Sequence, residues 1–351
     1  MKRILFTMTM FAFGLVAYSQ NNIALTDANI FTTGANYKKA NEKELILHRH
    51  AKEIYDGNTQ ELLFNPLKAR SGSGIVLKLK TKSPRVKLKV VVQKGGKGQA
   101  IFGIRENGIQ LANVRLKSTV DLEQTIVLKN TSKGSCSTFQ ISLPLWLDVH
   151  VTGIELEDNY SLEKIKKETK GVYIAYGDSI THGRGQDITE ETYAYKLAES
   201  LNMELFNIAV GGGKASNVTA KMIANDFENI DLITVLIGYN DLVGNGISLE
   251  VFHKRYKDVL ETIRIKHKKT KIVCITLLTT KTLKSKKSGH KPEEFREVIK
   301  TIVNAKIAQG DKKLVLVEGP SYSSLAGLND AVHLNKSGAV VLAKALANEL
   351  E

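Results

Sequence analysis

Apolar and polar positions alternate with a period of two through the first part of the chain, from about Asn22 to Asn159. In residues 75–80, apolar side chains fall on one face and two lysines on the other, which is the pattern of a strand with one buried face. Further strands are expected at residues 86–92, 100–104, 109–116, 124–128 and 138–143, with turns at Gly95-Gly96 and Asn107-Gly108. Many short strands separated by glycine-rich turns predict an all-β sandwich or jelly roll.

The spacing of apolar residues changes after the strongly charged stretch at residues 161–170. Compact apolar strands are expected at residues 172–176, 205–210, 232–237, 272–277 and 314–317. Helical spacing fills the gaps, at residues 192–201, 216–227, 249–266, 293–307 and 336–350. Strands that alternate with helices predict a parallel sheet covered by helices on both faces. We therefore expect two domains, a β-sandwich at residues 21–160 and an α/β domain at residues 161–351.

The N-terminal segment, residues 1–20, differs from everything that follows. Lys2 and Arg3 precede an apolar run that ends near Ala17, and Ala17 and Ser19 are the small residues of a cleavage site. This layout predicts a secretory signal peptide, because the run is too short to span a membrane; an uncleaved N-terminal anchor is the alternative. No later segment approaches about 18 uninterrupted apolar residues. We therefore expect a secreted or periplasmic protein whose mature chain has no integral membrane segment.

Composition and charge narrow the class of partner. Hydrophobic residues make up 42% of the chain and charged residues 25%, as in a soluble globular protein. The formal net charge of +14 could attract acidic polysaccharide or an anionic envelope surface. The lysines are scattered and no nucleic-acid motif accompanies them, so we expect mostly solvated surface charge and no nucleic-acid partner. The oligomeric state is left open.

Polar or glycine-rich clusters follow the expected strands of the α/β domain. They are Gly177-Asp178-Ser179-Ile180, Gly211-Gly212-Gly213, Gly238-Tyr239-Asn240-Asp241 and Asp330-Ala331-Val332-His333. Each of them alone could be ordinary turn or helix-cap chemistry. In an open parallel sheet, however, functional groups gather beyond the carboxyl ends of the strands. We therefore expect the four clusters to converge.

These clusters supply the parts that acyl transfer requires. Ser179 is the candidate nucleophile, and a serine hydroxyl needs an adjacent base. His333 is the candidate base, and Asp330 precedes it in the same loop, where its carboxylate can orient the imidazole. We expect the backbone N–H groups of Ser179 and Gly212 and the side-chain amide of Asn240 to hold the developing oxyanion. No metal or cofactor is implied.

The four clusters resemble the conserved blocks of the SGNH/GDSL hydrolases, in family order. Gly177-Asp178-Ser179-Ile180 resembles the first block, with Ile180 where leucine is usual, and Gly212 is similar to the glycine of the second. The threefold glycine leaves that second assignment uncertain by one residue. Gly238-Tyr239-Asn240-Asp241 and Asp330-Ala331-Val332-His333 resemble the third and fifth blocks. The resemblance covers about residues 171–351 and implies a three-layer α/β/α, flavodoxin-like hydrolase domain.

A fainter likeness concerns the end of the first half. Leu143-Pro144-Leu145-Trp146, followed by Val149 and Gly153-Ile154, is similar to the end of the sandwich domain that precedes some SGNH esterases. Several of those are carbohydrate deacetylases. The resemblance therefore implies a secreted serine esterase that removes short acyl groups, chiefly acetyl, from a carbohydrate or polysaccharide. A lipid or thioester acyl hydrolase and a non-catalytic glycan-binding protein are the alternatives.

Five further side chains carry separate expectations. His182 and Arg184 lie just past the Ser179 turn and are candidates to line the pocket and contact substrate oxygens, although exposed loop positions would suit them equally. His48 and His50 alternate on a possible strand. Since a metal site needs further ligands and no third ligand is in view, we expect these two to pair at the surface. Trp146 is expected to anchor the junction between the domains rather than form a sugar platform.

Overall fold

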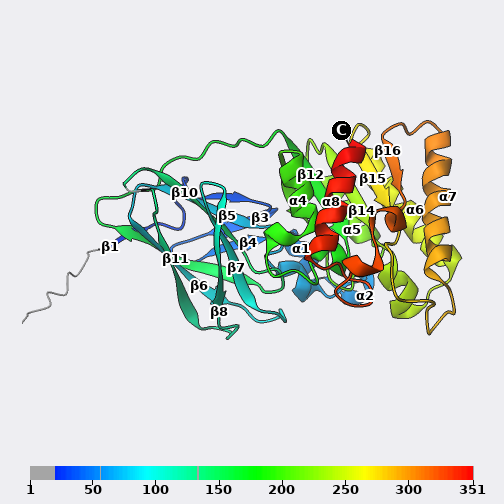
Figure 1. Cartoon of the computed structure of the whole chain (residues 1–351), viewed down its shortest axis with the longest axis horizontal. Coiled ribbons are helices and arrows are strands. Elements are labelled where there is room, and N and C mark those ends of the chain that lie inside the picture. The colour runs from blue at the N-terminus through cyan, green and yellow to red at the C-terminus, as the bar shows by residue number, and fades with distance from the viewer. Residues whose placement is uncertain (1–19, 56, 133, 351) are drawn as a thin grey trace, which may run out of the picture.

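The computed structural model describes residues 20–55, 57–132 and 134–350. The signal peptide expected at residues 1–20 lies outside them, apart from Gln20. The described chain has an antiparallel β half and a parallel α/β half, which lie side by side (Figure 1). Within the described ranges, no helix has the length and apolar character that crossing a bilayer would require.

Two antiparallel sheets make up the β half. One has the strand order β3-β4-β11-β6-β9, with β1 paired to β11, and the other has the order β2-β5-β10-β7-β8. Their strands are β1 (Gln20–Ile23), β2 (Phe31–Thr33), β3 (Tyr37–Ala40), β4 (Leu45–His48), β5 (Val76–Thr81), β6 (Arg85–Val92), β7 (Ala100–Glu106), β8 (Ile109–Leu116), β9 (Glu123–Lys129), β10 (Ser137–Ser142) and β11 (Val149–Glu157).

Alternation explains how these strands pack. Along β6 every second side chain, from Val86 to Val92, is buried, and apolar residues of both sheets form one shared core. Asn107 and Gly108 link β7 to β8 with φ values of 51° and 82°, the left-handed pair that a tight type I′ hairpin requires. The alternating segments therefore form strands, as expected. Their jelly-roll likeness stays a prediction.

The α/β half contains a parallel sheet with the order β13-β12-β14-β15-β16, which is the flavodoxin-like order. Its strands are β12 (Gly171–Gly177), β13 (Met203–Asn207), β14 (Leu232–Leu236), β15 (Lys271–Ile275) and β16 (Leu314–Val317). Its main helices are α4 (Tyr193–Ser200), α5 (Asn217–Asp226), α6 (Leu249–Lys266), α7 (Pro292–Ala308) and α8 (Lys336–Leu350). Short helical turns are α3 (Ser179–His182), η2 (Thr189–Glu191), η3 (Asp241–Asn245), η4 (Gly319–Tyr322) and η5 (Leu325–Gly327).

The helices form a layer on each face of this sheet. In the interior strand β12, Tyr173 and Ala175 pack into the core that includes α4 and α8. Their neighbours Ile174 and Tyr176 pack into the core that includes α5, α6 and α7. Because both faces are covered, the buried strands are apolar on both sides. The three-layer α/β/α fold expected from the sequence is confirmed.

A helical segment early in the chain belongs to the core of the α/β half. It comprises α1 (Lys52–Tyr55), α2 (Thr59–Leu62) and η1 (Pro66–Arg70), and α2 packs against α5. Its buried apolar side chains, Ile54, Leu62, Phe64 and Ala69, join the core on the α5 side of the sheet. In Figure 1, α1 and α2 accordingly lie beside the α/β half rather than among the β-sheets. Period-two alternation did not predict this segment.

Candidate active site

Ser179 lies where the first strand of the parallel sheet ends. β12 ends at Gly177, Asp178 caps the next turn by accepting a hydrogen bond from Ile180 N at 3.0 Å, and Ser179 is the first residue of α3. A Cβ atom at position 177 would lie 2.2 Å from Thr181 Oγ1 and 2.8 Å from Leu236 O. Only glycine therefore fits before this turn, which leaves the Ser179 side chain half-buried at the carboxyl edge of the sheet.

His333 meets Ser179 from a segment far along the chain. The His333 Nε2 atom lies 2.8 Å from Ser179 Oγ. Its other ring nitrogen, Nδ1, lies 2.7 Å from Asp330 Oδ2. Because a carboxylate only accepts hydrogen bonds, Nδ1 carries the proton, and Nε2 is left to accept from the serine hydroxyl. The structure thus joins Ser179, His333 and Asp330 in one hydrogen-bonded chain.

Asp330 is fixed by the backbone around it. Its Oδ1 accepts hydrogen bonds from Val332 N and His333 N, both at 2.9 Å. Partial burial opposes ionisation, but these two N–H groups and the His333 imidazole outweigh it and lower the Asp330 pKa to about 2. The carboxylate is therefore charged at neutral pH and holds one orientation of the imidazole.

Gly212 and Asn240 lie on turns that adjoin the Ser179 turn. Val210 N donates to Gly177 O at 3.2 Å, which brings the glycine loop beside the nucleophile, and Gly212 has a φ of 85° that favours glycine. The Asn240 Nδ2 atom lies 3.1 Å from Gly213 O and 3.3 Å from Asp178 Oδ2. The expected oxyanion donors are thus neighbours at one edge of the sheet, and their role stays a prediction.

His182 does not face the pocket. It is fully buried, and its Nε2 lies 2.7 Å from Leu145 O and 2.9 Å from Ser71 Oγ. Its Nδ1 accepts a hydrogen bond from Gly211 N at 3.0 Å, and burial holds its pKa well below the usual value. The expectation that His182 contacts substrate is therefore wrong: a neutral His182 supports the glycine loop from behind. Arg184 is exposed, and its contact with substrate stays a prediction.

Trp146 completes this support from the β half. Its ring stacks on the His182 ring with a centroid separation of 3.9 Å and an interplanar angle of 14°. A Cβ atom at Gly211 would lie 2.6 Å from the same ring, so the loop passes close against the indole. Trp146 therefore sits at the junction of the two halves, as the sequence suggested.

Two basic residues that precede β5 in the chain reach the same loop, and sequence reasoning missed both. Arg49 is fully buried, and its guanidinium donates to Asn207 O and Ala209 O, both at 2.6 Å. Lys68 Nζ donates to Gly211 O at 3.1 Å and approaches the Cβ position of Gly212 within 3.8 Å. No local pattern marks either residue, because their partners are far away in the sequence.

His48 and His50 are not surface residues, so that expectation is wrong. Both are buried. His50 Nε2 lies 2.9 Å from Ile208 O and its Nδ1 lies 3.1 Å from Ala69 O. His50 therefore joins Arg49 in fixing the segment that ends β13, whereas His48 points to a different part of the β half.

Two buried carboxyl groups lie under the active-site turns. Burial raises the pKa of Asp178 to about 7, with a further increase from the nearby Asp241. Burial likewise raises the pKa of Asp241 to about 6, although Ala215 N and Arg255 lower it in part. Asp241 Oδ2 accepts from Ala215 N at 3.0 Å, so both groups hold loops in place.

Residues 175–341 match the model of the GDSL-like lipase/acylhydrolase family. The C-terminal half is a GDSL-like acylhydrolase domain. The matched range contains both Ser179 and His333, and the SGNH fold expected from the sequence is confirmed for this domain. A search of curated protein sequences finds no significant match.

Solved structures resemble the whole chain rather than the GDSL-like domain alone. The salicylyl-acyltransferase SsfX3 from a tetracycline biosynthetic pathway gives a TM-score of 0.81 at 20% identity, covering 94% of this chain and 96% of that one. A GDSL-like lipase from Bacteroides ovatus gives 0.75 at 19% identity, covering 95% and 97%. The acetyl xylan esterase Est2A from Butyrivibrio proteoclasticus gives 0.65 at 13% identity, covering 95% and 98%. These likenesses establish the shared fold, including the β half.

Proposed function

We propose that this protein is a secreted serine esterase that hydrolyses short acyl esters, chiefly acetyl, on a carbohydrate. The observation that carries the proposal is the contact of Ser179 Oγ with His333 Nε2 at 2.8 Å, continued by His333 Nδ1 to Asp330. Nucleophile, base and orienting carboxylate in this order are the recurring arrangement of serine hydrolases on unrelated folds.

The mechanism follows from the hydrogen bonds. His333 Nε2 takes the proton of the Ser179 hydroxyl as Oγ attacks the ester carbonyl carbon. The alcohol leaves with that proton, and an acyl-enzyme on Ser179 remains. Water then attacks the acyl carbon as His333 takes one of its protons. The acid is released when the bond between the acyl carbon and Ser179 Oγ breaks and His333 returns the proton to Oγ. Asp330, ionised by virtue of its low pKa, stabilises the imidazolium in both halves of the reaction.

Oxyanion stabilisation is assigned to three donors around the Ser179 turn. They are Ser179 N at the start of α3, Gly212 N and Asn240 Nδ2. In the resting arrangement Asn240 Nδ2 contacts Gly213 O and Asp178 Oδ2, so one of its hydrogens turns toward the substrate when the ester binds. Loss of one such donor typically lowers kcat by about 10²–10³-fold.

The carbohydrate assignment is supported by structural neighbours. A family two carbohydrate esterase from Clostridium thermocellum, solved in complex with cellohexaose, gives a TM-score of 0.64 at 16% identity, covering 80% of this chain and 92% of that one. The acetyl xylan esterase Est2A shares the β half as well as the hydrolase domain. Export of the protein is supported by the basic and apolar pattern of residues 1–20.

A panel experiment tests this function. Acetate release is measured from acetylated plant and algal polysaccharides, with chromogenic acetyl and decanoyl esters in parallel. We expect acetyl to be preferred and Ser179→Ala to lower kcat by at least about 10³-fold, because the nucleophile is removed. A strong preference for decanoyl esters would instead identify a lipid acyl hydrolase. Unchanged hydrolysis in Ser179→Ala, with glycan binding retained, would identify a binding protein.

Acyl transfer is the second candidate function. It is favoured by the similarity to SsfX3, which is an acyltransferase with a TM-score of 0.81 to this chain. An acyl-enzyme on Ser179 can be resolved by an acceptor hydroxyl in place of water. The test adds acceptor sugars or phenols during turnover of an acetyl ester. Formation of the acceptor ester at the expense of free acetate would replace hydrolysis by transfer as the main reaction.

A further inference from the structure

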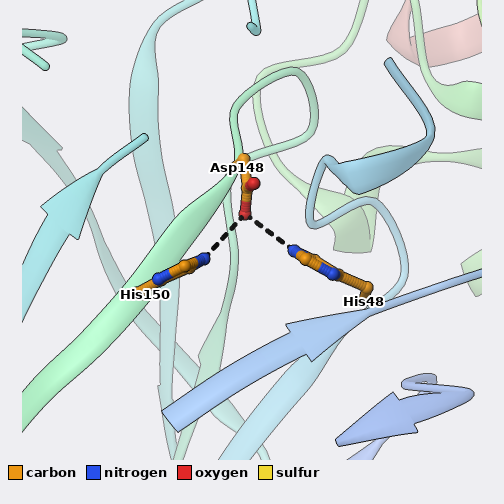
Figure 2. Close-up of side chains that lie close together, drawn as sticks. All are labelled: His48, Asp148 and His150. Carbon is orange, nitrogen blue, oxygen red and sulfur yellow. Dashed lines mark hydrogen bonds and ion pairs between the residues drawn. The ribbon is translucent and has the colours of Figure 1, made fainter. Parts of the chain in front are cut away.

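Three polar side chains converge in the β half, away from the active site. His48 ends β4, Asp148 immediately precedes β11, and His150 lies two residues further on. Figure 2 shows both imidazole rings directed at the Asp148 carboxylate. His48 Nε2 lies 3.0 Å and His150 Nε2 lies 3.6 Å from Asp148 Oδ1, and the three ligand atoms lie within 4.8 Å of one another. We call these three residues the His-Asp-His cluster.

Strand geometry explains the convergence. β4 and β11 are antiparallel, with Leu45 opposite Val151. Extending that register toward the strand ends sets His48 opposite Asp148. Because side chains alternate between the two faces of a strand, Asp148 and His150 share one face. The cluster is therefore fixed by backbone register rather than by flexible loops.

Glu44 decides which nitrogen of His150 is free. Its Oε2 lies 2.7 Å from His150 Nδ1, so Nδ1 carries a proton and Nε2 is the nitrogen that faces Asp148. A cation bound there would replace any proton on Nε2 and take its lone pair. In metal sites the imidazole ligand usually donates its second N–H to a carboxylate. Glu44 supplies this arrangement for His150.

His48 is free to adopt the matching tautomer. Its Nδ1 is buried and has no hydrogen-bond partner among the described residues. Without a metal ion, the hydrogen bond to Asp148 Oδ1 at 3.0 Å keeps a proton on Nε2. A bound cation would replace that proton, and Nδ1, which has no competing partner among the described residues, can carry the ring proton instead. Both imidazoles can then offer a lone pair to one point beside Asp148.

Asp148 places a buried negative charge at that point. It is only 3% exposed, and its ion-pair partners among the described residues are the two histidines alone. A buried carboxylate is costly unless a cation or strong hydrogen bonds balance it. A divalent cation held by the carboxylate and two imidazoles would supply that balance.

The cluster opens to solvent on one side. It lines a cavity of about 440 Å³ together with Tyr37, Tyr55 and Arg70. Lys39, Lys52 and Lys94 also border it, but all three are exposed, so water and salt screen their charge. The cavity leaves room for water to complete the coordination of a bound ion.

We propose that the His-Asp-His cluster binds one divalent transition-metal ion of the zinc class, through His48 Nε2, His150 Nε2 and an Asp148 carboxylate oxygen. Two imidazoles and one carboxylate form a ligand set that suits Zn²⁺, with water in the fourth position. Among the described residues, β4 and β11 pair in register through Leu45 and Val151 alone, so the ion would join these strands where their ladder stops. Its role is to stabilise the β half.

Zinc binding to the full chain tests the proposal. The chain is prepared without a polyhistidine tag, stripped with a chelator and titrated with Zn²⁺ against a chromophoric competitor. Bound metal is counted by mass spectrometry, and Tm is measured with and without Zn²⁺. We expect one ion per chain at this site and a higher Tm in zinc. His150→Ala should abolish both effects.

Matched variants separate this site from other histidines. His290→Ala removes a histidine of the α/β half that lies two residues before α7, with its Nδ1 3.0 Å from Glu294 Oε1, and should leave zinc binding unchanged. His333→Ala removes the active-site histidine and should likewise leave zinc binding unchanged. Glu44→Gln should still fold, because Glu44 is only half-buried, and should weaken binding by about tenfold or more.

Three outcomes would overturn the proposal. They are a chain that stays free of metal at micromolar Zn²⁺, zinc affinity that is unchanged in His150→Ala, and zinc affinity that disappears in His333→Ala. The first two results leave the esterase proposal untouched, because none of the cluster residues belongs to the active site. The third would place the zinc at the active-site histidine instead of the cluster.

Discussion

Asp330 shows how single residues set the chemistry of this site. One carboxylate oxygen accepts two backbone N–H groups and the other faces His333 Nδ1. The backbone fixes the carboxylate, and the carboxylate in turn fixes the imidazole tautomer. Since Nε2 can accept the Ser179 proton only in that tautomer, the activity should depend on the charge of Asp330.

Asp330→Asn tests this dependence. The amide is of similar size but carries no charge and can present an N–H to His333, which favours the wrong tautomer. We expect kcat to fall by roughly 10²–10⁴-fold, the range that positioned acid–base catalysis contributes, while KM changes little. Steady-state kinetics on an acetyl ester measure the effect. Asp258→Asn, on the exposed face of α6 beside Lys254, is the control and should retain activity.

Asp178 and Asp241 set the pH dependence of stability. Their folded-state pKa values, about 7 and about 6, lie above the usual value near 4. The folded state therefore keeps protons that the unfolded chain loses between about pH 4 and pH 7. The stability that these protons provide is complete below about pH 4 and is lost as the pH rises through 6 and 7.

We accordingly predict that these two carboxyl groups contribute a decrease in the free energy of unfolding from about pH 5 to pH 7, whereas the buried His50 and His182, whose pKa values burial lowers, contribute an increase below about pH 6.5. Each group contributes a slope of at most about 1.4 kcal/mol per pH unit. Asp178→Asn should reduce the slope, because the asparagine cannot titrate. Urea unfolding at several pH values measures it. An identical slope in wild type and variant would show that Asp178 does not titrate in this range.

At the scale of elements, the end of β13 depends on residues from the β half. Arg49 follows β4, and its guanidinium binds the carbonyls of Asn207 and Ala209 as well as Ser71 O at 2.8 Å. The carbonyls of Asn207 and Ala209 belong to the segment that leads into the Gly211–Gly213 loop. Arg49 therefore satisfies buried acceptors and positions the loop that carries Gly212.

Arg49→Met removes the donors but keeps most of the volume. Several buried carbonyls are then left without a partner, so we expect a loss of at least about 2 kcal/mol in stability and a lower kcat. Urea unfolding and ester kinetics measure the two effects. Arg264→Met is the matched control, since Arg264 binds His267 O and Thr270 O before β15, at the opposite end of the sheet. It should cost stability without lowering kcat.

The whole molecule behaves as two halves with a shared core. Four apolar side chains of the early helical segment are buried beside α5. Trp146 of the β half and Lys68 of the early helical segment contact the glycine loop of the hydrolase domain. The active site is therefore built on contributions from both halves. Removal of the β half should expose apolar surface and loosen the loop together.

A truncation tests this interdependence. We predict that residues 161–351 expressed alone are unstable and inactive. Burial of one large apolar side chain stabilises the folded state by roughly 1.5–3 kcal/mol, and the total free energy of unfolding of a protein is only about 5–15 kcal/mol. Thermal unfolding and ester hydrolysis check the prediction. An active fragment with the Tm of the full chain would contradict it. The comparison is a second fragment that begins at residue 49 and omits residues 72–160, because it keeps Arg49 and the early helical segment but not the sheets of the β half.

The sequence by itself determined most of the elements and the side chains that meet around Ser179. Period-two alternation located β5 to β10, and the change in the spacing of apolar residues after residue 161 located the parallel sheet and its helices. The clusters around Ser179, Asn240 and His333 were found because strand ends and turn residues are local features, and the carboxyl ends of parallel strands meet at one edge. This rule predicted that the clusters would converge without any coordinates.

Only the tertiary structure decided what depends on distant partners. His182 looked like a pocket residue, but its burial depends on Trp146 and Ser71, which no local pattern connects to it. Arg49 and the early helices serve the hydrolase domain although they lie among strands in the sequence. The His-Asp-His cluster arises from the register between β4 and β11, a relation across 100 residues. Periodicity reports the face on which a side chain lies, whereas packing between distant segments decides what it touches.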